Sequence, residues 1–386
     1  MAADVAATLS SPPFSYDKGA NVMPSEPLPK GLEGVEVDET GISFVDGERG
    51  VLSYRGVDID ELVERPFDEV AALVATGRPD PDFGARLAAS AGLSQRESRL
   101  VCSLPRAVHP MHVLQGVTPL LDRDEAFADL GDAAQGFAVA ARLPALIATH
   151  LHGTAAGAYP ELGHPERFLA QIAAPQTEAV RRAFNVTQIL QIEHGFNAST
   201  FAARVAASTL APVENALSAG FGTLHGGLHG GADQAALEVA ERVGSAAAAP
   251  AFVDRCIADG TRVMGMGHRE YRVLDPRARH IKQLARTVSA GTPHEQTFQT
   301  LAAIEDRFRE RMAEKGKALH ANVEFYKGVV YRVLGMTPPF FTTGFAMARV
   351  FGYLAHFIES RRDNRLIRPK ARYTGPPVRA GRLTPA

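Results

Sequence analysis

Apolar and polar positions follow two different periods along this chain, and the change from one to the other comes early. Residues 34–38 and 51–54 alternate apolar with polar side chains, which is typical of short strands, and Asp46-Gly47 between them favours a tight turn. After residue 59, apolar positions recur at spacings of three and four, and prolines and glycines separate these segments. The pattern predicts a mainly α fold with a small β element near the N-terminus.

A helix with clear borders is predicted from residue 292 onward. Thr292 is a suitable N-cap, and Pro293 fits the first helical position, where the N–H that proline lacks is not needed. Spacings of three and four then put five apolar side chains on one face: Phe298, Leu301, Ile304, Phe308 and Met312. We expect this face to pack against the core.

The most apolar stretch of the chain, residues 340–358, is almost long enough to span a bilayer. Arg349 and His356 interrupt it, so we interpret it as a buried core helix. A buried arginine needs a partner that offsets its charge, and Arg349 is therefore expected to meet an anion.

The composition is that of a soluble globular protein. The chain has 386 residues, of which 45% are hydrophobic and 22% charged, and its net charge of −2 excludes the basic surface of a nucleic-acid-binding protein. The length allows one large domain or two. The only cysteines in the sequence, Cys102 and Cys256, indicate a reducing compartment rather than a disulfide framework or a zinc cluster.

The first 30 residues contain several prolines, lack an apolar signal core and include no arginine. We expect residues 1–30 to form a mobile, extended arm that crosses a partner subunit. Without a signal or transit sequence, the protein is expected to be cytoplasmic.

Candidate chemistry gathers around residues 265–277. Gly265 and Gly267 allow a tight turn that leads directly to His268. Asp275 is a suitable N-cap for a helix that begins with proline, which puts Arg277 in the first turn. A histidine and an arginine this close favour a pocket for a small acid whose carbonyl is polarised. The alternative is a glycine turn, a surface histidine and a capped helix.

Two further segments carry histidines between apolar helices. His194 belongs to the polar cluster of residues 193–200, in which Asn197 and Ser199 fit as helix caps. His225 and His229 are four residues apart, like two metal ligands on one helix, and a pair of glycines follows each. These glycines disfavour a helix and no third ligand has a suitable spacing, so we expect no metal there.

Two charged features occur toward the C-terminus. Glu324 is expected in the first turn of a helix capped by Asn322, where the helix dipole favours its charged form. Arg368 belongs to a basic run that on its own indicates a solvated surface. Neither feature identifies a function by itself.

Taken together and in this order, these segments resemble the citrate synthase family. The similarity extends over roughly residues 31–375, and several ordered motifs are far more specific than one. The motifs are Tyr54-Arg55-Gly56-Val57-Asp58-Ile59, His109-Pro110-Met111, Glu193-His194-Gly195-Phe196-Asn197-Ala198-Ser199-Thr200, Leu228-His229-Gly230-Gly231-Ala232, Gly265-Met266-Gly267-His268, Asp275-Pro276-Arg277, Asn322-Val323-Glu324, Met347-Ala348-Arg349 and Ile367-Arg368-Pro369. The length corresponds to the shorter form of the family, without the N-terminal domain of the NADH-sensitive enzymes.

The resemblance implies an almost all-helical homodimer whose subunits have two domains that close over the substrate. The large domain would comprise residues 31–229 and 327–386, and the small domain residues 230–326. It also implies the condensation of oxaloacetate with acetyl-CoA to citrate and CoA, with the acyl-CoA as co-substrate and no permanently bound cofactor.

The resemblance also implies roles for individual residues. His229 would donate a hydrogen bond to the thioester oxygen as the enol forms, Glu324 would remove the methyl proton, and His268 would polarise the ketone of oxaloacetate. Oxaloacetate would be held by three residues of one subunit and one of its neighbour, namely His194, Arg277 and Arg349, with Arg368 from the neighbour. The loop that lies against the CoA adenine would include Val263, Met264, Gly265 and Gly267.

One departure from the family pattern and two alternative functions stay open at this point. The family usually has aspartate at the position of Glu324. A 2-methylcitrate synthase would use propionyl-CoA with the same residues, because one methylene changes discrimination by only about 1–3 kcal/mol. A non-catalytic paralogue that binds CoA or dicarboxylates is the alternative of another class.

Overall fold

The computed structural model describes residues 28–268 and 270–374. The chain divides after Glu39 into two units, which we describe separately. In the first unit, the described residues include one short 3-10 helix, η1 (Lys30–Leu32). The predicted arm, residues 1–30, lies outside the described residues except for its last three.

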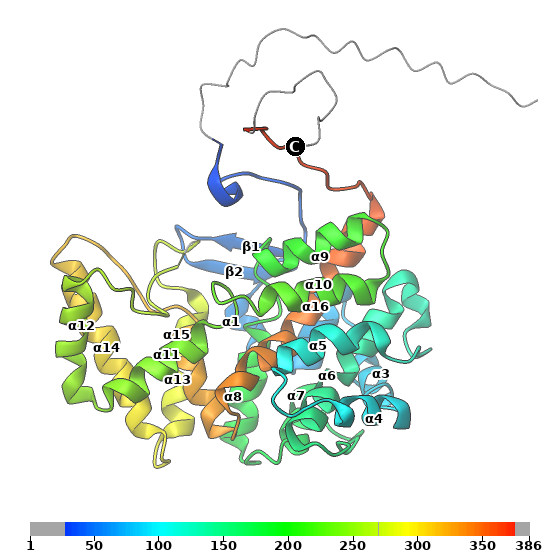
Figure 1. Ribbon diagram of the computed structural model, residues 1–386, viewed down its shortest axis with the longest axis horizontal. Coiled ribbons are helices and arrows are strands. Elements are labelled where there is room, and N and C mark those ends of the chain that lie inside the picture. Colours follow the sequence, from blue (N-terminus) through cyan, green and yellow to red (C-terminus); the bar gives the residue numbers. More distant parts are fainter. Residues whose placement is uncertain (1–27, 269, 375–386) are drawn as a thin grey trace, which may run out of the picture. The chain divides into compact units, whose positions relative to one another are not determined.

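The β element is a three-stranded antiparallel sheet in the order β1-β2-β3, formed by Ser43–Asp46, Val51–Tyr54 and Val57–Asp58. Phe44 pairs with Ser53 and Asp46 with Val51, so the predicted turn at residues 46–47 is confirmed (Figure 1). The predicted strand at residues 34–38 is wrong. Val35 and Val37 on this segment are both exposed, so the alternation does not provide a buried face.

Helices make up most of the second unit, which confirms the mainly α fold predicted from the sequence. The α-helices are α1 (Ile59–Leu62), α2 (Phe67–Thr76), α3 (Phe83–Ala89), α4 (Gln95–Ser103), α5 (Pro110–Val117), α6 (Ala134–His152), α7 (His164–Gln171), α8 (Glu178–Ile189), α9 (Ala198–Ser208), α10 (Val213–Leu224), α11 (Ala232–Val243), α12 (Ala249–Ala258), α13 (Pro276–Ser289), α14 (Glu295–Ala313), α15 (Glu324–Val333) and α16 (Phe341–Arg362). Short 3-10 helices lie at Thr118–Leu120 (η2), Ala128–Ala133 (η3), Ala246–Ala248 (η4) and Pro338–Phe340 (η5).

Helix α16 lies at the centre of the unit, as Figure 1 shows in orange. Every residue from Phe341 to Phe357 is buried, including Arg349 and His356, and the helix packs against α2, α5, α6, α8, α9 and α10. A helix that is apolar on all sides is stable only inside a core. The buried core helix predicted at residues 340–358 is therefore confirmed. Within the described part of the chain, none of the helices has the length and apolar character needed to cross a bilayer.

Helices α11 to α14 form the group on one side of the unit in Figure 1, where α15 joins them to the rest. Helix α15 packs against α11 and α13 and also touches α8. The five predicted apolar residues of α14 are all buried, but the helix begins at Glu295 rather than at Pro293. The Thr292 hydroxyl accepts a hydrogen bond from the His294 amide in a turn before the helix. The division into large and small domains stays a prediction.

Candidate active site

The loop of His268 is fastened to the start of helix α15. Met266 and Ala321 form an isolated antiparallel bridge, in which the Gly267 amide donates to the His320 carbonyl at 2.8 Å. The Asn322 amide donates to the Gly265 carbonyl at 2.9 Å. This backbone pairing brings together two segments that are more than fifty residues apart in sequence.

Gly265 is required by this close approach. Its φ of +80° lies in the left-handed region, and a Cβ atom there would come within 2.7 Å of a ring carbon of Phe325. The glycine pattern in the sequence therefore marked a real contact between the loop and the helix that carries Glu324.

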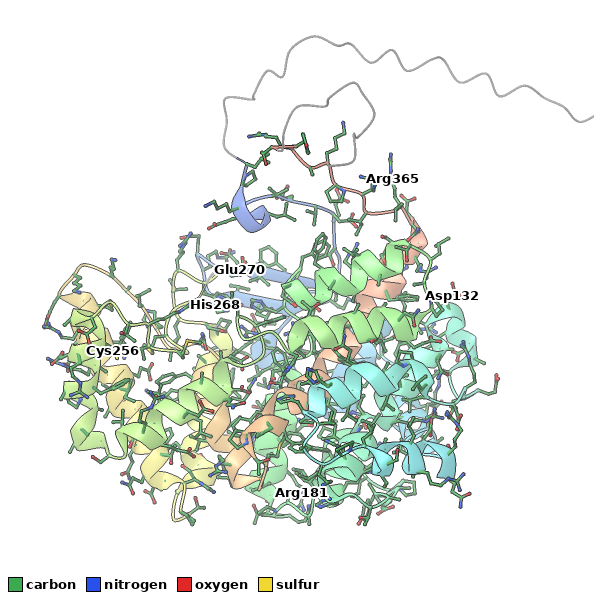
Figure 2. All side chains as sticks on the ribbon, viewed as in Figure 1. Asp132, Arg181, Cys256, His268, Glu270 and Arg365 are labelled. Atoms are coloured by element: carbon green, nitrogen blue, oxygen red, sulfur yellow. The ribbon has the colours of Figure 1, made fainter. Side chains whose placement is uncertain are left out.

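The hydrogen bonds of His268 define its tautomer. Its Nδ1 accepts from the backbone amides of Glu270 at 3.0 Å and Tyr271 at 3.3 Å, so the ring hydrogen is on Nε2. Burial, helped by the positive charge of Arg277, lowers the pKa of His268 to about 4. His268, which Figure 2 shows close to Glu270, is therefore a neutral hydrogen-bond donor at pH 7.

Arg277 lies in the first turn of α13, which begins with Asp275 as N-cap as predicted. Its Nε and Nη2 donate to the two carboxylate oxygens of Asp275 at 3.0 and 2.8 Å, and Nη2 lies 3.4 Å from His268 Nε2. The guanidinium thus already holds one carboxylate, which the sequence did not indicate. A substrate anion would have to share Arg277 with Asp275.

His194 lies beside both Tyr271 and His268. Its Nε2 is 3.2 Å from the Tyr271 hydroxyl, and its ring centroid is 5.4 Å from that of His268. Burial lowers the pKa of His194 well below its ordinary value, and the cations Arg277 and Arg349 act in the same direction. His194 is therefore a second neutral imidazole of the site.

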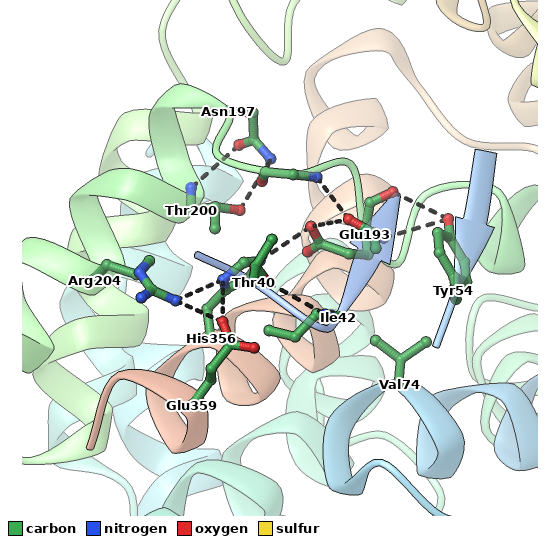
Figure 3. Close-up of polar contacts among 12 residues, drawn as sticks. Thr40, Ile42, Tyr54, Val74, Glu193, Asn197, Thr200, Arg204, His356 and Glu359 are labelled. Atoms are coloured by element: carbon green, nitrogen blue, oxygen red, sulfur yellow. Dashed lines mark hydrogen bonds and ion pairs between the residues drawn. The ribbon is translucent and has the colours of Figure 1, made fainter. Parts of the chain in front are cut away.

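The residue before His194 anchors this segment to the core (Figure 3). The fully buried carboxylate of Glu193 is 3.1 Å from His356 Nε2, and the Tyr54 hydroxyl donates to the Glu193 carbonyl at 3.1 Å. Arg204 Nη1 lies 3.1 Å from His356 Nδ1, so Arg204 donates there and His356 donates to Glu193. This chain of bonds fixes the backbone at His194.

Arg349 and His356 lie two turns apart on the same face of α16, and both contact the residues before His194. Arg349 Nε donates to the Gln191 carbonyl at 2.8 Å, and its guanidinium carbon lies 4.8 Å from the ring centroid of Phe345. Arg349 forms no ion pair among residues 28–268 and 270–374. Its charge nevertheless acts on Glu193, whose pKa is lowered against the effect of burial, first by His356 and then by Arg349. This guanidinium therefore retains capacity for an anionic ligand.

His229 lies on the loop between α10 and α11, which is not helical, as the glycines predicted. Its Nε2 is 2.7 Å from the Ser199 hydroxyl and 3.2 Å from Asn197 Oδ1. Because Nε2 faces Ser199 and Asn197, Nδ1 is the ring nitrogen that can face a ligand. Burial, followed by the charges of Arg349 and Lys327, lowers the pKa of His229 to about 4.

Glu324 is the first residue of α15, and its amide donates to Asn322 Oδ1 at 3.0 Å. The side chain of Asn322 therefore caps the segment as predicted, although the N-cap position itself belongs to Val323. The Glu324 carboxylate forms an ion pair with Lys327, one turn further along the helix. Lys327 is fully buried, and the sequence analysis did not identify it.

The predicted CoA loop and the predicted partner arginine differ in exposure. Val263 and Met266 are buried, whereas Met264 is partly exposed, so the loop offers its backbone and the Met264 side chain to a ligand. Arg368 is exposed, and its Nη1 donates to the Pro369 carbonyl at 3.4 Å. Within the described part of the chain, no hydrogen bond or ion pair joins Arg368 to the other candidate residues.

The residues that the sequence analysis missed are the partners of the candidates. They include Ser199 and Tyr271, which it assigned to no site, and Lys327, the lysine in the middle of a helix whose residues 325–331 are all buried. Such a lysine is a usable signal, because buried lysines almost always have partners. In the described segments, no group of three or more histidine, cysteine, aspartate or glutamate side chains is arranged to hold a metal ion.

A cavity of about 330 Å³ lies elsewhere, beside α11 and α12, and its lining includes Arg242, Phe252 and Cys256. Cys256 is a residue of α12, and Figure 2 shows it away from His268. None of the candidate residues lines this cavity, so we identify the site by its chemistry and not by cavity size.

Comparison with known proteins gives one consistent result. The family model "Citrate synthase, C-terminal domain" matches residues 31–370. A citrate synthase of Deinococcus radiodurans is 32% identical over 90% of this chain and 96% of that protein. A 2-methylcitrate synthase of Mycobacterium tuberculosis is 34% identical over 97% of this chain and 96% of that protein.

Solved structures agree with these matches. The crystal structure of citrate synthase from Thermotoga maritima is similar with a TM-score of 0.81 and 32% identity, over 92% of this chain and 98% of that one. The ternary complex of carboxymethyl coenzyme A and oxaloacetate with citrate synthase from Thermoplasma acidophilum has a TM-score of 0.82 and 27% identity, with the same coverage of 92% and 98%. The fold and these relatives define an enzyme of the acyltransferase type. The chain belongs to the citrate synthase family.

Proposed function

We propose that this protein condenses oxaloacetate with acetyl-CoA to give citrate and free CoA. The observation that carries the proposal is the tautomer of His268, whose Nε2–H is available as a donor beside the guanidinium of Arg277. A neutral donor next to a fixed cation suits the polarisation of a ketone in a substrate that also carries carboxylates.

In the first step, the Glu324 carboxylate would take a proton from the methyl group of acetyl-CoA. The C–H bond breaks, an O–H bond forms on Glu324, and the electron pair moves toward the thioester to give the enol or enolate. His229 would donate a hydrogen bond to the thioester oxygen from Nδ1, while Ser199 and Asn197 hold its other ring nitrogen. A base and a donor on either side are what a weakly acidic thioester requires.

In the second step, the new nucleophilic carbon would form a C–C bond to the ketone carbon as the C=O π bond breaks, and His268 Nε2–H would donate a hydrogen bond to the developing alkoxide. The alkoxide would finally take up a proton equivalent to the one that Glu324 removed, so that the carboxylate is restored. His194, Arg277 and Arg349 would hold the substrate, because guanidinium groups match carboxylates. Hydrolysis of the resulting thioester would release citrate and CoA.

We infer further that the active unit is a cytoplasmic homodimer. Arg368 is exposed and has only a weak contact with its own neighbour, so it is available to the active site of a second subunit. Residues 230–326 would act as a small domain that closes on the rest, residues 31–229 and 327–386, and excludes water. The backbone of Val263, Met264, Gly265 and Gly267 would contact the adenine of CoA.

The second candidate function is that of a 2-methylcitrate synthase. It is supported by the 34% identity to such an enzyme. The two functions differ by one methylene in the acyl group, and the same catalytic residues serve both.

Release of free CoA thiol with oxaloacetate and acetyl-CoA tests the proposal, with propionyl-CoA in a parallel reaction. We expect faster release from acetyl-CoA and citrate as the product identified by mass spectrometry. A higher kcat/KM for propionyl-CoA would favour the second candidate, and no release with either acyl-CoA would contradict both.

A further inference from the structure

The buried ammonium of Lys327 connects three elements that carry the proposed catalytic groups. Its Nζ lies 3.2 Å from Asp233 Oδ2 on α11 and 3.1 Å from Gln191 Oε1 after α8, and it forms an ion pair with Glu324 on its own helix. The ammonium donates to Gln191 and is held between the two carboxylates by their charges. The Lys327 and Asp233 side chains are both 0% exposed, whereas the Glu324 side chain is 12% exposed and is the member of the cluster that a ligand can reach.

The position of each partner matters for the site. Asp233 lies in the first turn of the helix that follows the His229 loop. Gln191 supplies the backbone carbonyl that Arg349 contacts. Lys327 therefore links the carboxylate of Glu324 to the segments of His229 and Arg349.

The charges of the cluster are unusual for a buried site. Two carboxylates share one ammonium, which leaves one negative charge in excess when all three groups are ionised. Burial opposes the charge of Lys327, yet Asp233 and Glu324 together raise its pKa above the ordinary value. Burial also raises the pKa of Asp233, with Lys327 acting in the opposite direction.

Proton abstraction changes this arrangement during turnover. When Glu324 takes the substrate proton, it becomes neutral and its ion pair with Lys327 is lost. With only that partner, Lys327 would then be a buried cation without a counter-ion, which is strongly unfavourable. Asp233 removes this penalty, because it remains charged and paired with Lys327 whether Glu324 is ionised or protonated.

We propose that Lys327 and Asp233 form a permanent ion pair that positions Glu324 and allows its carboxylate to accept and release a proton inside a buried site. Lys327 and Asp233 are positioning residues, and Glu324 alone exchanges the proton. The inference rests on the proposed function, in which Glu324 is the base.

Other charged or titratable groups also face the cluster. His229 interacts with both Arg349 and Lys327, Tyr331 interacts with Lys327, and His268 interacts with Glu324. The histidines are neutral at pH 7 because their pKa values are low, and burial raises the pKa of Tyr331. None of these groups changes charge near neutral pH, so the acidic limb of the pH–rate profile reports on the carboxylates.

The test measures kcat against pH for Lys327→Met and Asp233→Asn. Removing the ammonium leaves two neighbouring carboxylates, which makes protonation easier, so the acidic limb should move to higher pH. Removing the second carboxylate makes protonation of Glu324 harder, so the limb should move to lower pH and kcat should fall at least about tenfold. The KM for oxaloacetate should change little in either variant.

Lys282→Met is the matched control, because it removes a lysine that is ion-paired with Glu305 but lies outside the site. Its pH–rate profile should match that of the parent. If Lys327→Met does not fold, Asp233→Asn and the double variant Asp233→Asn/Lys327→Met still decide the question. The double variant should have a limb above that of Asp233→Asn, because the cation that opposes protonation is gone.

The inference would be overturned if the acidic limb of the pH–rate profile stayed at the parent position in both an active Asp233→Asn variant and an active Lys327 variant. A fall in thermal stability would not change that conclusion. The proposed function would be unaffected by that result. Failure of the parent protein to condense oxaloacetate with a short acyl-CoA would instead contradict the proposed function.

Discussion

Met266 pairs with Ala321 across an isolated antiparallel bridge, and this pairing joins the loop of His268 to the segment that leads into Glu324. Each of these two side chains follows the bridge by a few residues, on a different strand of it. The proposed ketone donor and the proposed base are therefore parts of one small backbone unit, closed by Gly265 against Phe325.

Replacement of Gly265 by alanine should disrupt this unit. Gly260 is the matched control, because its φ of +67° is also left-handed but a Cβ atom there would meet nothing within 4 Å. Gly260→Ala should cost about 1–2 kcal/mol of stability from backbone strain alone and leave kcat unchanged. Gly265→Ala adds a clash with Phe325, so it should lower both stability and kcat by more. Equal effects in urea denaturation and turnover assays would contradict this account of the loop.

Arg349→Met should weaken the binding of oxaloacetate far more than the binding of CoA. The guanidinium is buried and forms no ion pair within the described residues, so its charge is free to hold a substrate carboxylate. Loss of such a contact costs on the order of 2–5 kcal/mol. Calorimetric titration of each ligand measures the difference, with the exposed Arg362→Met on the same helix as control. Similar losses for both ligands would mean that Arg349 does not select oxaloacetate.

Arg368 should act in the site of the neighbouring subunit. Variants Arg368→Ala and His268→Asn should each be nearly inactive alone, because each lacks one group in both sites. Refolded together in equal amounts, they should recover about a quarter of the parent activity, since half of the dimers are mixed and each of these has one intact site. No recovery in confirmed heterodimers would assign Arg368 to its own subunit or to no site.

Stability should fall as the medium is acidified through the range in which the site histidines differ between folded and unfolded states. Burial lowers the pKa of His229 and of His268 to about 4, below the ordinary 6.5, so the unfolded chain binds more protons between these values. Their contribution is fully present above about pH 6.5 and is lost as the pH falls toward about 4. His268→Asn should therefore show a weaker pH dependence of Tm than the parent over this window. An unchanged dependence would contradict the low pKa of His268.

The sequence predicted the parts of this protein that depend on local patterns. The helical fold, the N-cap at Asp275, the buried helix around Arg349 and the turn at residues 46–47 follow from periodicity and capping. The strand expected at residues 34–38 was wrong, because alternation alone does not decide which face has a core to pack against. Partners that come from distant segments could not be predicted, as the contact of Lys327 with Asp233 illustrates.

The site shows the same limit. The candidate residues were identified because their motifs, in this order, resemble those of a known family. Their mutual geometry, however, depends on contacts between residues that are far apart in the sequence. Asp275 holds Arg277, and Ser199 meets His229, in ways that no spacing rule indicates. The tautomer of His268 likewise depends on two backbone amides that only the folded loop brings to its ring.

The central claim is that Glu324 removes a proton from the methyl group of a bound acyl-CoA. The most direct measurement follows exchange of the acetyl-CoA methyl protons with deuterated solvent in the presence of an oxaloacetate analogue that cannot react. The parent should exchange, whereas Glu324→Gln should lose at least about 10²-fold in exchange and turnover with oxaloacetate affinity nearly intact, and Glu324→Asp should retain much more activity. Exchange by Glu324→Gln at the parent rate would contradict the claim, and a parent with neither exchange nor condensation would be a non-catalytic member of the family.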